Sequence, residues 1–381
     1  MLVCLFLALT YDVIELTLFS ITILAIGLGA YLWSRASLKR VTCELTLNRE
    51  RLFPGEKLIV RIKAANAKFI PILFKVDLFV TKAVAGSDAG QWISEEQGLL
   101  WFQQSAFWKE FFPNQRGVFD LGPPTIRGGD LFGFFFRHRT MPDRFEVIVY
   151  PRITSIRSFT IPKKEFFGIP GSKSPVEDPV FVFGTRDYLP GRPARRIHWK
   201  TSARHNRLQE KLCEPAEQEK VLLILDVAGF KVKEAKEDFE KILEVIAALV
   251  LQMDGRNIAV GFITNGHIIG NKSRIIPISR NSFQMAAILE TLARVTRDST
   301  GPVTDIIAKG YRVLGGVSGL YFAWNRSKQI RAASSFMKHR NTPIQFILAR
   351  ETPVMEIRHI MHVENIIYVA DILIRKSESN E

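Results

Sequence analysis

The sequence predicts a multidomain protein with an N-terminal transmembrane helix, a β-sandwich domain of the Ig-like type and a doubly wound α/β domain. An apolar run near the N-terminus predicts the helix, and short alternating segments between turn residues predict the sandwich. Strand and helix patterns that alternate in the C-terminal half predict the α/β domain. The predicted parts are a membrane anchor at 1–34, a β-sandwich at 41–150, a connector at 151–217 and an α/β domain at 218–381.

The composition argues against several classes of protein. Hydrophobic residues make up 47% of the 381 residues and charged residues 24%, a balance that excludes disorder along the whole chain. The three cysteines are scattered without a Cys-x-x-Cys pair, which argues against a disulfide framework and a cysteine zinc site. The net charge of +14 predicts attraction to something anionic, such as lipid headgroups, nucleic acid or an acidic protein.

The predicted transmembrane helix runs over about 13–33, with Glu15 as its only charged residue. A hydrocarbon core of about 30 Å is crossed by about 20 helical residues, which this run supplies. Tyr31 and Trp33 stand where an aromatic belt meets the headgroups, and basic residues begin at Arg35. The positive-inside rule then predicts a protein of the cell membrane, plasma or inner, with its later domains facing the cytoplasm.

Two alternatives for the N-terminus stay open. A cleaved signal peptide would also be apolar, but residues 1–34 contain no Lys or Arg and no clear Ala-x-Ala cleavage site. Residues 2–9 are apolar and too short to span a membrane alone, so they can form one arm of a hairpin that turns at Asp12. The sequence therefore leaves open whether the chain has one or two membrane segments.

The stretch from 41 to 150 contains several short segments of β type, among them TCELTLNRE, EKLIVRIKAAN and ILFKVDLFV. Turn formers separate them, and Pro54-Gly55 suits a tight turn because proline fixes φ and glycine accepts a positive φ. This spacing predicts an antiparallel sandwich. A cluster that alternates too poorly for a base-stacking platform is interpreted as core, or as a patch facing the membrane or a partner: Phe132, Phe134, Phe135 and Phe136.

From about 218 the pattern becomes strand, helix, strand, helix. The continuous apolar run at 221–226 predicts a strand buried on both faces, and 233–253 has apolar residues at helical spacing. Further strands are expected at 258–264, 319–324, 343–349 and 365–370, a hairpin around Asn265-Gly266, and helices near 282–295, 303–314, 327–340 and 353–361. Such units predict a mostly parallel sheet whose natural site is the rim near Asp226, Thr264 and Asn325.

The connector is irregular at 151–185 and strongly basic beyond it. Residues 186–211 hold eight Lys or Arg against two acids, a net charge of +6. Arginine grips carboxylates and phosphates with paired hydrogen bonds, so the segment is either an anionic docking surface or a set of structural pairs with neighbouring acids and carbonyls. Trp199 and Tyr188 are expected to pack against an apolar surface.

A motif runs through this basic segment, and its residues are Arg186, Tyr188, Gly191, Arg195, Arg196, Trp199, Ser202 and Arg204. It resembles the pattern R-x-Y-x-x-G-D-x-x-R-x-I-x-W-x-x-S-A-R of the bacterial and archaeal family named domain of unknown function 58. The upstream stretch RGVFDLGPPTIRGGDLFGFF at 116–135 is similar to that family's second signature, and the resemblance covers about 10–350. One departure is Arg192, where the family has Asp. These residues are predicted to bind a partner or to form a structural signature.

The resemblance implies that the C-terminal part looks like a von Willebrand factor A domain. In such domains a D-x-S-x-S motif, a Thr and a later Asp hold Mg²⁺ through oxygen ligands. Here Asp226 stands, but the serine positions are Ala228 and Phe230, and the later Asp is Asn325. Too few oxygen ligands remain, so we predict a degenerate metal site at Asp226, with no bound metal or cofactor.

The leading hypothesis is a membrane-anchored, non-enzymatic scaffold or adaptor. The resemblance implies a MoxR-type AAA+ ATPase as its partner, in the assembly or maturation of protein complexes. The sequence has no G-x-x-x-x-G-K-[ST] motif, so ATP use would belong to the partner. His198, Ser202 and Asp187 are not framed by a G-x-S-x-G turn, and no catalytic residue is predicted.

Two alternatives come from other classes. One is a metal-dependent ligand-binding domain of the adhesion type. The other is an anionic-lipid or nucleic-acid binder driven by the charge, although no nucleic-acid motif supports it and we expect no nucleic acid as partner.

Overall fold

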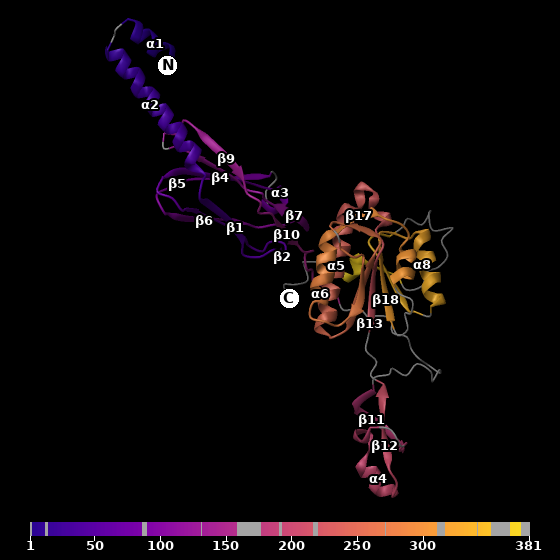
Figure 1. Cartoon of the computed structure of the whole chain (residues 1–381). Coiled ribbons are helices and arrows are strands. Elements are labelled where there is room, and N and C mark those ends of the chain that lie inside the picture. The colour runs from indigo at the N-terminus through magenta and orange to yellow at the C-terminus, as the bar shows by residue number, and fades with distance from the viewer. Residues whose placement is uncertain are drawn as a thin grey trace, which may run out of the picture. The chain divides into compact units, whose positions relative to one another are not determined.

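In the computed structural model, the internal contacts divide the chain into two units (Figure 1). The first unit holds Met1–Ile153 with Ile268–Lys272 and Leu289–Val295, and the second holds Thr154–His267, Ser273–Ile288 and Thr296–Glu381. The predicted domain boundaries stay predictions. The structure describes residues 2–11, 14–85, 90–130, 132–157, 177–189, 193–215, 220–270, 272–310, 317–340, 342–351 and 366–374.

The first unit begins with two apolar helices, α1 (Leu2–Thr10) and α2 (Ile14–Ser37). Within the described residues, α2 is the helix that is long and apolar enough to cross a membrane, with 24 residues and mostly exposed side chains. A signal sequence near an N-terminus meets the same two criteria of length and composition. The prediction of an apolar N-terminal helix is confirmed, and its insertion and orientation stay predictions.

Lys68 holds the C-terminal end of α2. Its ammonium donates hydrogen bonds to the carbonyl oxygens of Ala36 (2.7 Å), Ser37 and Lys39 (2.9 Å). Carbonyls at a helix end lack intrahelical partners and carry partial negative charge, so a buried cation satisfies them. Burial lowers the pKa of Lys68 to about 8, with the charge of Arg139 as the second cause, and the side chain therefore remains protonated near neutral pH. The helix is thus attached firmly to the strands that follow.

A Lys68→Met variant is expected to lose about 2 kcal/mol of stability, because buried carbonyls lose their donor. The midpoint of thermal unfolding of the full chain in detergent measures this loss. Lys63→Met is the matched control, since Lys63 is an exposed lysine on the strand that precedes Lys68. Equal midpoints for the two variants would show that Lys68 does not hold the helix.

Three small sheets of the first unit enclose one apolar core. The core includes the fully buried side chains of Leu45, Ile62, Phe74, Val76 and Val147. Alternate residues along the strands point into it, as the period of a strand requires. The sheets are β1 (Val41–Leu47), β3 (Leu58–Asn66) and β6 (Gln104–Phe111); β2 (Arg51–Leu52), β10 (Phe145–Val149) and β7 (Gly117–Leu121); and β5 (Gln91–Leu99), β4 (Ile72–Val80), β8 (Thr125–Gly129) and β9 (Phe136–Thr140), with α3 (Lys82–Ala85) after β4. A β-rich domain is confirmed, and its Ig-like type stays a prediction.

The second unit contains a six-stranded mixed sheet of order β16-β14-β13-β18-β19-β20. Its central strands are parallel, and β13 is almost wholly buried, which explains its continuous apolar sequence. Helices α5 and α6 lie on one side of the sheet and α8 on the other (Figure 1). The bounds are β13 (Lys220–Leu225), β14 (Ala259–Thr264), β16 (Ile275–Ser279), β18 (Val317–Ala323), β19 (Ile344–Leu348), β20 (Ile366–Tyr368), η2 (Ala228–Lys231), η3 (Lys233–Ala235), α5 (Lys236–Gly255), α6 (Gln284–Arg294), α7 (Val303–Gly310), α8 (Lys328–His339) and α10 (Val369–Ile372).

Two parts of this region differ from the prediction. The antiparallel pair expected around Asn265-Gly266 is present, but its connection is longer than a tight turn and carries β15 (Gly266–Ile268), which pairs with β17 (Val295–Ser299) in a separate sheet. The strand that pairs with β14 is β16, which runs antiparallel to it at the edge of the main sheet. The predicted helix at 353–361 lies outside the described residues. The likeness to a von Willebrand factor A domain stays an expectation of the resemblance.

Candidate functional site

The motif in the basic segment, which we expected in a connector at 151–217, lies on a hairpin arm. β11 (Glu177–Asp187) pairs antiparallel with β12 (Gln209–Pro215), and η1 (Ala194–Arg196) and α4 (Trp199–His205) lie between them. We call residues 177–215 the hairpin arm. Gly191 of the motif lies outside the described residues.

Arg186 and Glu210 form an ion pair across the two strands of the arm. The register places them opposite each other, and Arg186 Nε donates to Glu210 Oε1. The carboxylate of Glu210 is buried, with 1% of its side chain exposed. A buried carboxylate without a partner is costly, so Arg186 stabilises the fold of the arm. At this residue the geometry favours the structural interpretation over the docking one.

Ser202 closes α4 against β12. Its Oγ accepts the backbone N–H of Gln209 (2.8 Å) and donates to the carbonyl of His198 (3.0 Å). The backbone N–H of His198 donates to the carbonyl of Gln209 (2.7 Å), and its ring Nδ1 accepts the N–H of Thr201 (3.2 Å). The carboxylate of Asp187 accepts from the side-chain amide of Gln209. These bonds give Ser202 and His198 a role in folding the arm.

Two other motif residues are partly enclosed. The side chain of Tyr188 is half-buried, and its backbone N–H donates to the carbonyl of Leu208 (2.9 Å), which continues the pairing of the arm. Arg196 is also half-buried and ends η1, where its N–H donates to the carbonyl of Pro193 (3.0 Å). Both positions therefore contribute to the turn of the arm.

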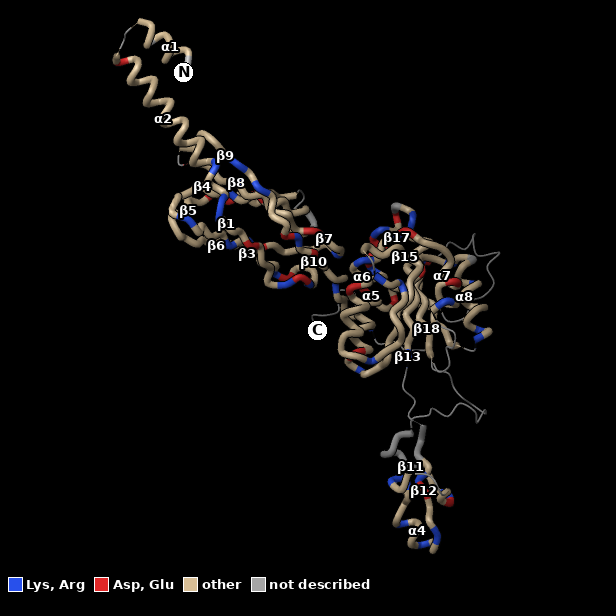
Figure 2. The backbone as a smooth tube through the Cα atoms, viewed as in Figure 1, with Lys and Arg blue, Asp and Glu red and all other residues tan. Residues whose placement is uncertain are grey.

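The remaining motif residues, Arg195, Trp199 and Arg204, are exposed. Trp199 has 67% of its surface exposed, so the expectation that it packs against an apolar surface is wrong. Lys200 follows it and is also exposed, and Figure 2 shows Lys and Arg gathered around α4. An exposed tryptophan among cations is typical of a protein-binding surface, because tryptophan and arginine dominate the energetics of such interfaces.

Asp226 lies at the carboxyl end of β13, at the rim predicted for a site. Its side chain is buried, and each carboxylate oxygen accepts hydrogen bonds from protein groups. Oδ1 accepts the N–H of Ala228 (3.0 Å) and the side-chain amide of Asn265 (2.8 Å), while Oδ2 accepts the hydroxyl of Tyr321 (2.7 Å). Asn265 also accepts the N–H of Val227 (2.8 Å), which fixes the turn after the strand.

This environment does not fit a Mg²⁺ ion. The ion needs several oxygen ligands, but both oxygens of Asp226 already accept hydrogen bonds, and the side chains of Ala228 and Phe230 offer none. Burial raises the pKa of Tyr321 far above its ordinary value, and the charge of Asp226 adds to this, so the hydroxyl keeps its proton and donates it. Asp226 is thus held in a network of protein hydrogen bonds, and the absence of a metal stays a prediction.

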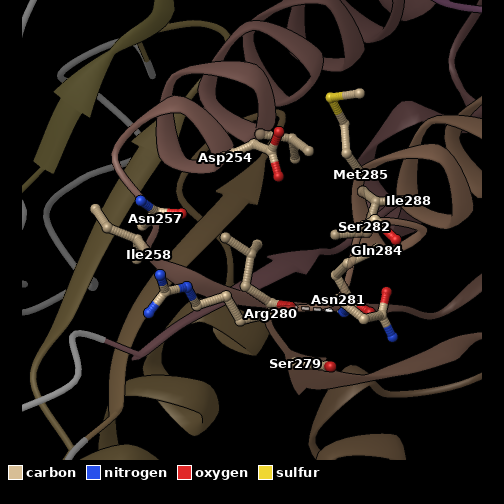
Figure 3. Close-up of a pocket in the computed structure, with 12 residues that line it drawn as sticks. Asp254, Asn257, Ile258, Ser279, Arg280, Asn281, Ser282, Gln284, Met285 and Ile288 are labelled. Carbon is tan, nitrogen blue, oxygen red and sulfur yellow. Dashed lines mark hydrogen bonds between the residues drawn. The ribbon is translucent and has the colours of Figure 1, made fainter.

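A separate shallow cavity of about 320 Å³ lies near the amino end of β14 (Figure 3). Its lining includes Asp254, Asn257, Arg280 and Gln284. The Gln284 amide already donates to the carbonyls of Val260 (2.7 Å) and Pro277 (2.8 Å). The cavity lies at the other end of β14 from Thr264 and is not part of the Asp226 network.

Sequence reasoning missed Glu210, Asn265 and Tyr321 as members of these sites. Glu210 can be identified as the partner of Arg186 only when the two strands of the arm are known to pair. Asn265 had a usable signal, because it directly follows the predicted strand at 258–264, and in the structure that strand pairs with β13. Tyr321 lies within an apolar strand and gives no signal until β18 is known to pair with β13, where Ile224 faces Tyr321.

Most of the hairpin arm and part of the α/β sheet match the sequences of a known family. Residues 184–313 match the family described as "Protein of unknown function DUF58". This part of the chain therefore contains a DUF58 domain, and the resemblance is confirmed there. We expected it to extend over about 10–350, and the match covers the narrower range, so the stretch at 116–135 lies outside it.

Other relatives are distant. The chain is 21% identical over 262 residues to "Uncharacterized protein YeaD" of Bacillus subtilis (strain 168), an alignment that covers 68% of this chain and 63% of the relative. The chain thus spans less than two thirds of that protein's length.

Among solved structures, the CARDB domain of the PF1109 protein from Pyrococcus furiosus is 13% identical, with a TM-score of 0.20 over 29% of this chain and 91% of that one. Alkylpurine DNA glycosylase AlkC from Pseudomonas fluorescens is 10% identical, with a TM-score of 0.19 over 29% and 30% of the two chains. With such low TM-scores, neither likeness carries an argument about function.

Proposed function

We propose that the protein is a membrane-anchored, non-enzymatic adaptor whose hairpin arm docks a partner protein with an acidic surface. The family resemblance makes a MoxR-type AAA+ ATPase the partner of choice, in the assembly or maturation of protein complexes. The observation that carries the proposal is the exposure of Arg195, Trp199 and Arg204, since the other described motif residues are engaged in folding the arm.

The anchor rests on α2 and on the charges that follow it. The helix has 24 residues, and its side chains are mostly exposed, which favours a lipid environment over a protein core. Arg35, Lys39 and Arg40 follow its apolar part, and by the positive-inside rule these charges support later domains that face the cytoplasm. That compartment is the one in which an AAA+ ATPase would find ATP.

The docking surface rests on the chemistry of α4 and its neighbours. Arginine binds carboxylates with paired hydrogen bonds, and an exposed indole supplies a large apolar contact with little conformational entropy to lose. Leu189 and Leu208, on either side of the turn of the arm, are also about half exposed, at 52% and 47%. Exposed apolar side chains together with exposed arginines on one arm fit an acidic protein surface better than a phosphate backbone, which needs no apolar contact.

Charge reversal on the arm tests the docking. An Arg195→Glu/Arg204→Glu variant of the full chain is expected to lose the partner while remaining folded, because both side chains are exposed. The measurement is crosslinking in the cells that make the protein, followed by purification from membranes and identification of what accompanies it. Arg61→Glu/Lys63→Glu is the matched control, since it changes the net charge equally at two exposed positions on β3.

The outcomes separate the hypotheses. An AAA+ ATPase that accompanies the unchanged chain and the control, but not the arm variant, supports the proposal. An ATPase that stays with the arm variant shows that docking does not use this surface. Nucleic acid or lipid without any ATPase would favour the charge-driven binder, whose affinity should fall steeply with salt.

A further inference from the structure

Three turns of the β-rich domain lie at the end from which α2 departs. β3 ends at Asn66, which pairs with Val41 just after the helix. Ile72 pairs with Leu99, so the turns after β3 and after β5 share that end. Gly129 pairs with Leu73 and with Phe136, so the turn between β8 and β9 joins them. Figure 1 shows α2 leaving the domain at this end of its strands.

These turns carry large apolar side chains that are exposed. Phe69 is 74% exposed and stacks on Trp101 at 5.9 Å between ring centroids. Phe132 is 69% exposed and stacks on Phe134 at 5.8 Å. We call Phe69, Trp101, Phe102, Phe132, Phe134 and Phe135 the aromatic collar. Exposed apolar groups gathered in this way mark an interaction site or a membrane contact.

Two contacts place the collar at a defined level of α2. The ring of Phe135 lies 5.8 Å from the ring of Tyr31 in an edge-on arrangement. The indole N–H of Trp33 donates to the carbonyl of Pro71 (2.8 Å), in the turn that also carries Phe69. Tyr31 and Trp33 are the residues predicted to lie at the membrane interface, where aromatic side chains are enriched. Two of the collar turns therefore lie beside the helix at the level of the residues predicted to meet the headgroups.

Basic side chains also lie at this end of the domain. The guanidinium of Arg137 lies 5.9 Å from the centre of the Tyr31 ring, and Lys39 and Arg40 are exposed just after the helix. Cations beside apolar aromatic groups fit a lipid headgroup region, because the rings enter the acyl boundary while the cations meet the phosphates. An apolar protein surface would offer these cations no anionic group to bind.

We propose that the aromatic collar inserts into the bilayer interface and seats the β-rich domain against the membrane around α2. The collar rests on the anchor proposed above, and it adds a second lipid contact that fixes the orientation of the domain. A domain held only by a single helix could rotate and tilt, whereas one seated by several rings around that helix presents one face to the lipid.

A fluorescent label on the collar tests this. The full chain is placed in vesicles of phosphatidylcholine and phosphatidylglycerol, with Cys4→Ser and Cys213→Ser in the background. Cys43 can stay because it is buried. Burial is the main cause that raises the pKa of its thiol to about 11, so the thiol is unreactive. An environment-sensitive label is attached at Phe134→Cys or at Trp101→Cys, and lipids with a spin-label quencher are added. The control position is Phe112→Cys, which is 49% exposed at the opposite end of β6.

We expect loss of fluorescence at positions 134 and 101 and none at 112. Flotation of the vesicles after a carbonate wash reports the anchor independently. If the chain floats and neither collar label is quenched, the proposed insertion of the collar is wrong, while the membrane anchor is supported. If the chain does not float, the anchor is wrong and the collar falls with it. Quenching at all three positions would overturn the collar as well, because it would show that lipid contact is not confined to this end.

Discussion

An Asp226→Ala variant is expected to lose about 4 kcal/mol of stability in the α/β sheet, because it breaks a buried network around a carboxylate. The hydroxyl of Tyr321 would lose its acceptor, and the side-chain amide of Asn265 would lose one of its acceptors. Tyr321 is completely buried, so water cannot replace the bond. Hydrogen exchange of the amides in β13 and β18 measures the loss locally, which avoids treating a chain of several domains as two-state.

The control for this variant is Asp226→Asn, which preserves the shape of the side chain. Its amide oxygen can accept from the N–H of Ala228, and its NH₂ can donate to the hydroxyl of Tyr321. The expected loss is smaller, about 2 kcal/mol, because part of the network survives. Equal losses in the two variants would show that the charge matters and not the hydrogen bonds.

The same pair of variants separates the adaptor from the adhesion-type hypothesis. If Asp226 holds a metal, Mg²⁺ should raise the protection of β13 in the unchanged chain, and both variants should abolish that effect. We expect no effect of Mg²⁺ on the unchanged chain, because both carboxylate oxygens are already used by protein donors.

The sequence predicted the elements of the α/β sheet well where burial dictates the residues. The strands β13, β14 and β19 lie within the predicted apolar runs or one residue beyond them, since a strand covered on both faces must be apolar throughout. The edge strand β16 was missed, because it is only partly buried and contains Pro277. Pairing order was also hidden, and with it the contact between Tyr321 and Asp226, which are 95 residues apart.

The hairpin arm shows why the candidate site was harder to predict than the fold. For the basic residues at 186–211 as a group, the sequence left docking and structural pairing both open, because their roles divide according to strand pairing that composition does not encode. Arg186 faces Glu210 and is used in the fold, whereas Arg195 and Arg204 are exposed. The phenylalanine cluster was equally ambiguous, because its meaning depends on its position beside Tyr31.

Replacing Asp130 by alanine is expected to cost about 3 kcal/mol and to release the turn that carries the collar phenylalanines. Asp130 is buried, and its carboxylate accepts the backbone N–H groups of Phe132 (3.0 Å), Phe134 (3.3 Å) and Phe135 (2.7 Å). Hydrogen exchange at these three amides measures the release. Asp120→Ala is the control, since Asp120 is an exposed aspartate on β7 of the same domain. Unchanged protection in the Asp130 variant would show that the turn is held by other contacts.

Acid should reproduce this effect in the unchanged chain. Burial by itself raises the pKa of Asp130, but hydrogen bonds from the backbone N–H groups outweigh it and hold the pKa below the ordinary value of 3.8. A carboxyl whose pKa is lower in the folded state contributes its full stabilisation above the unfolded value and loses it as the pH falls through the folded value. Protection of the three amides should therefore decrease only below pH 3.8, and an Asp130→Asn variant should lack this dependence. If the aromatic collar seats the domain on lipid, quenching of a label at position 134 should weaken over the same pH range, because a released turn no longer presents its rings together.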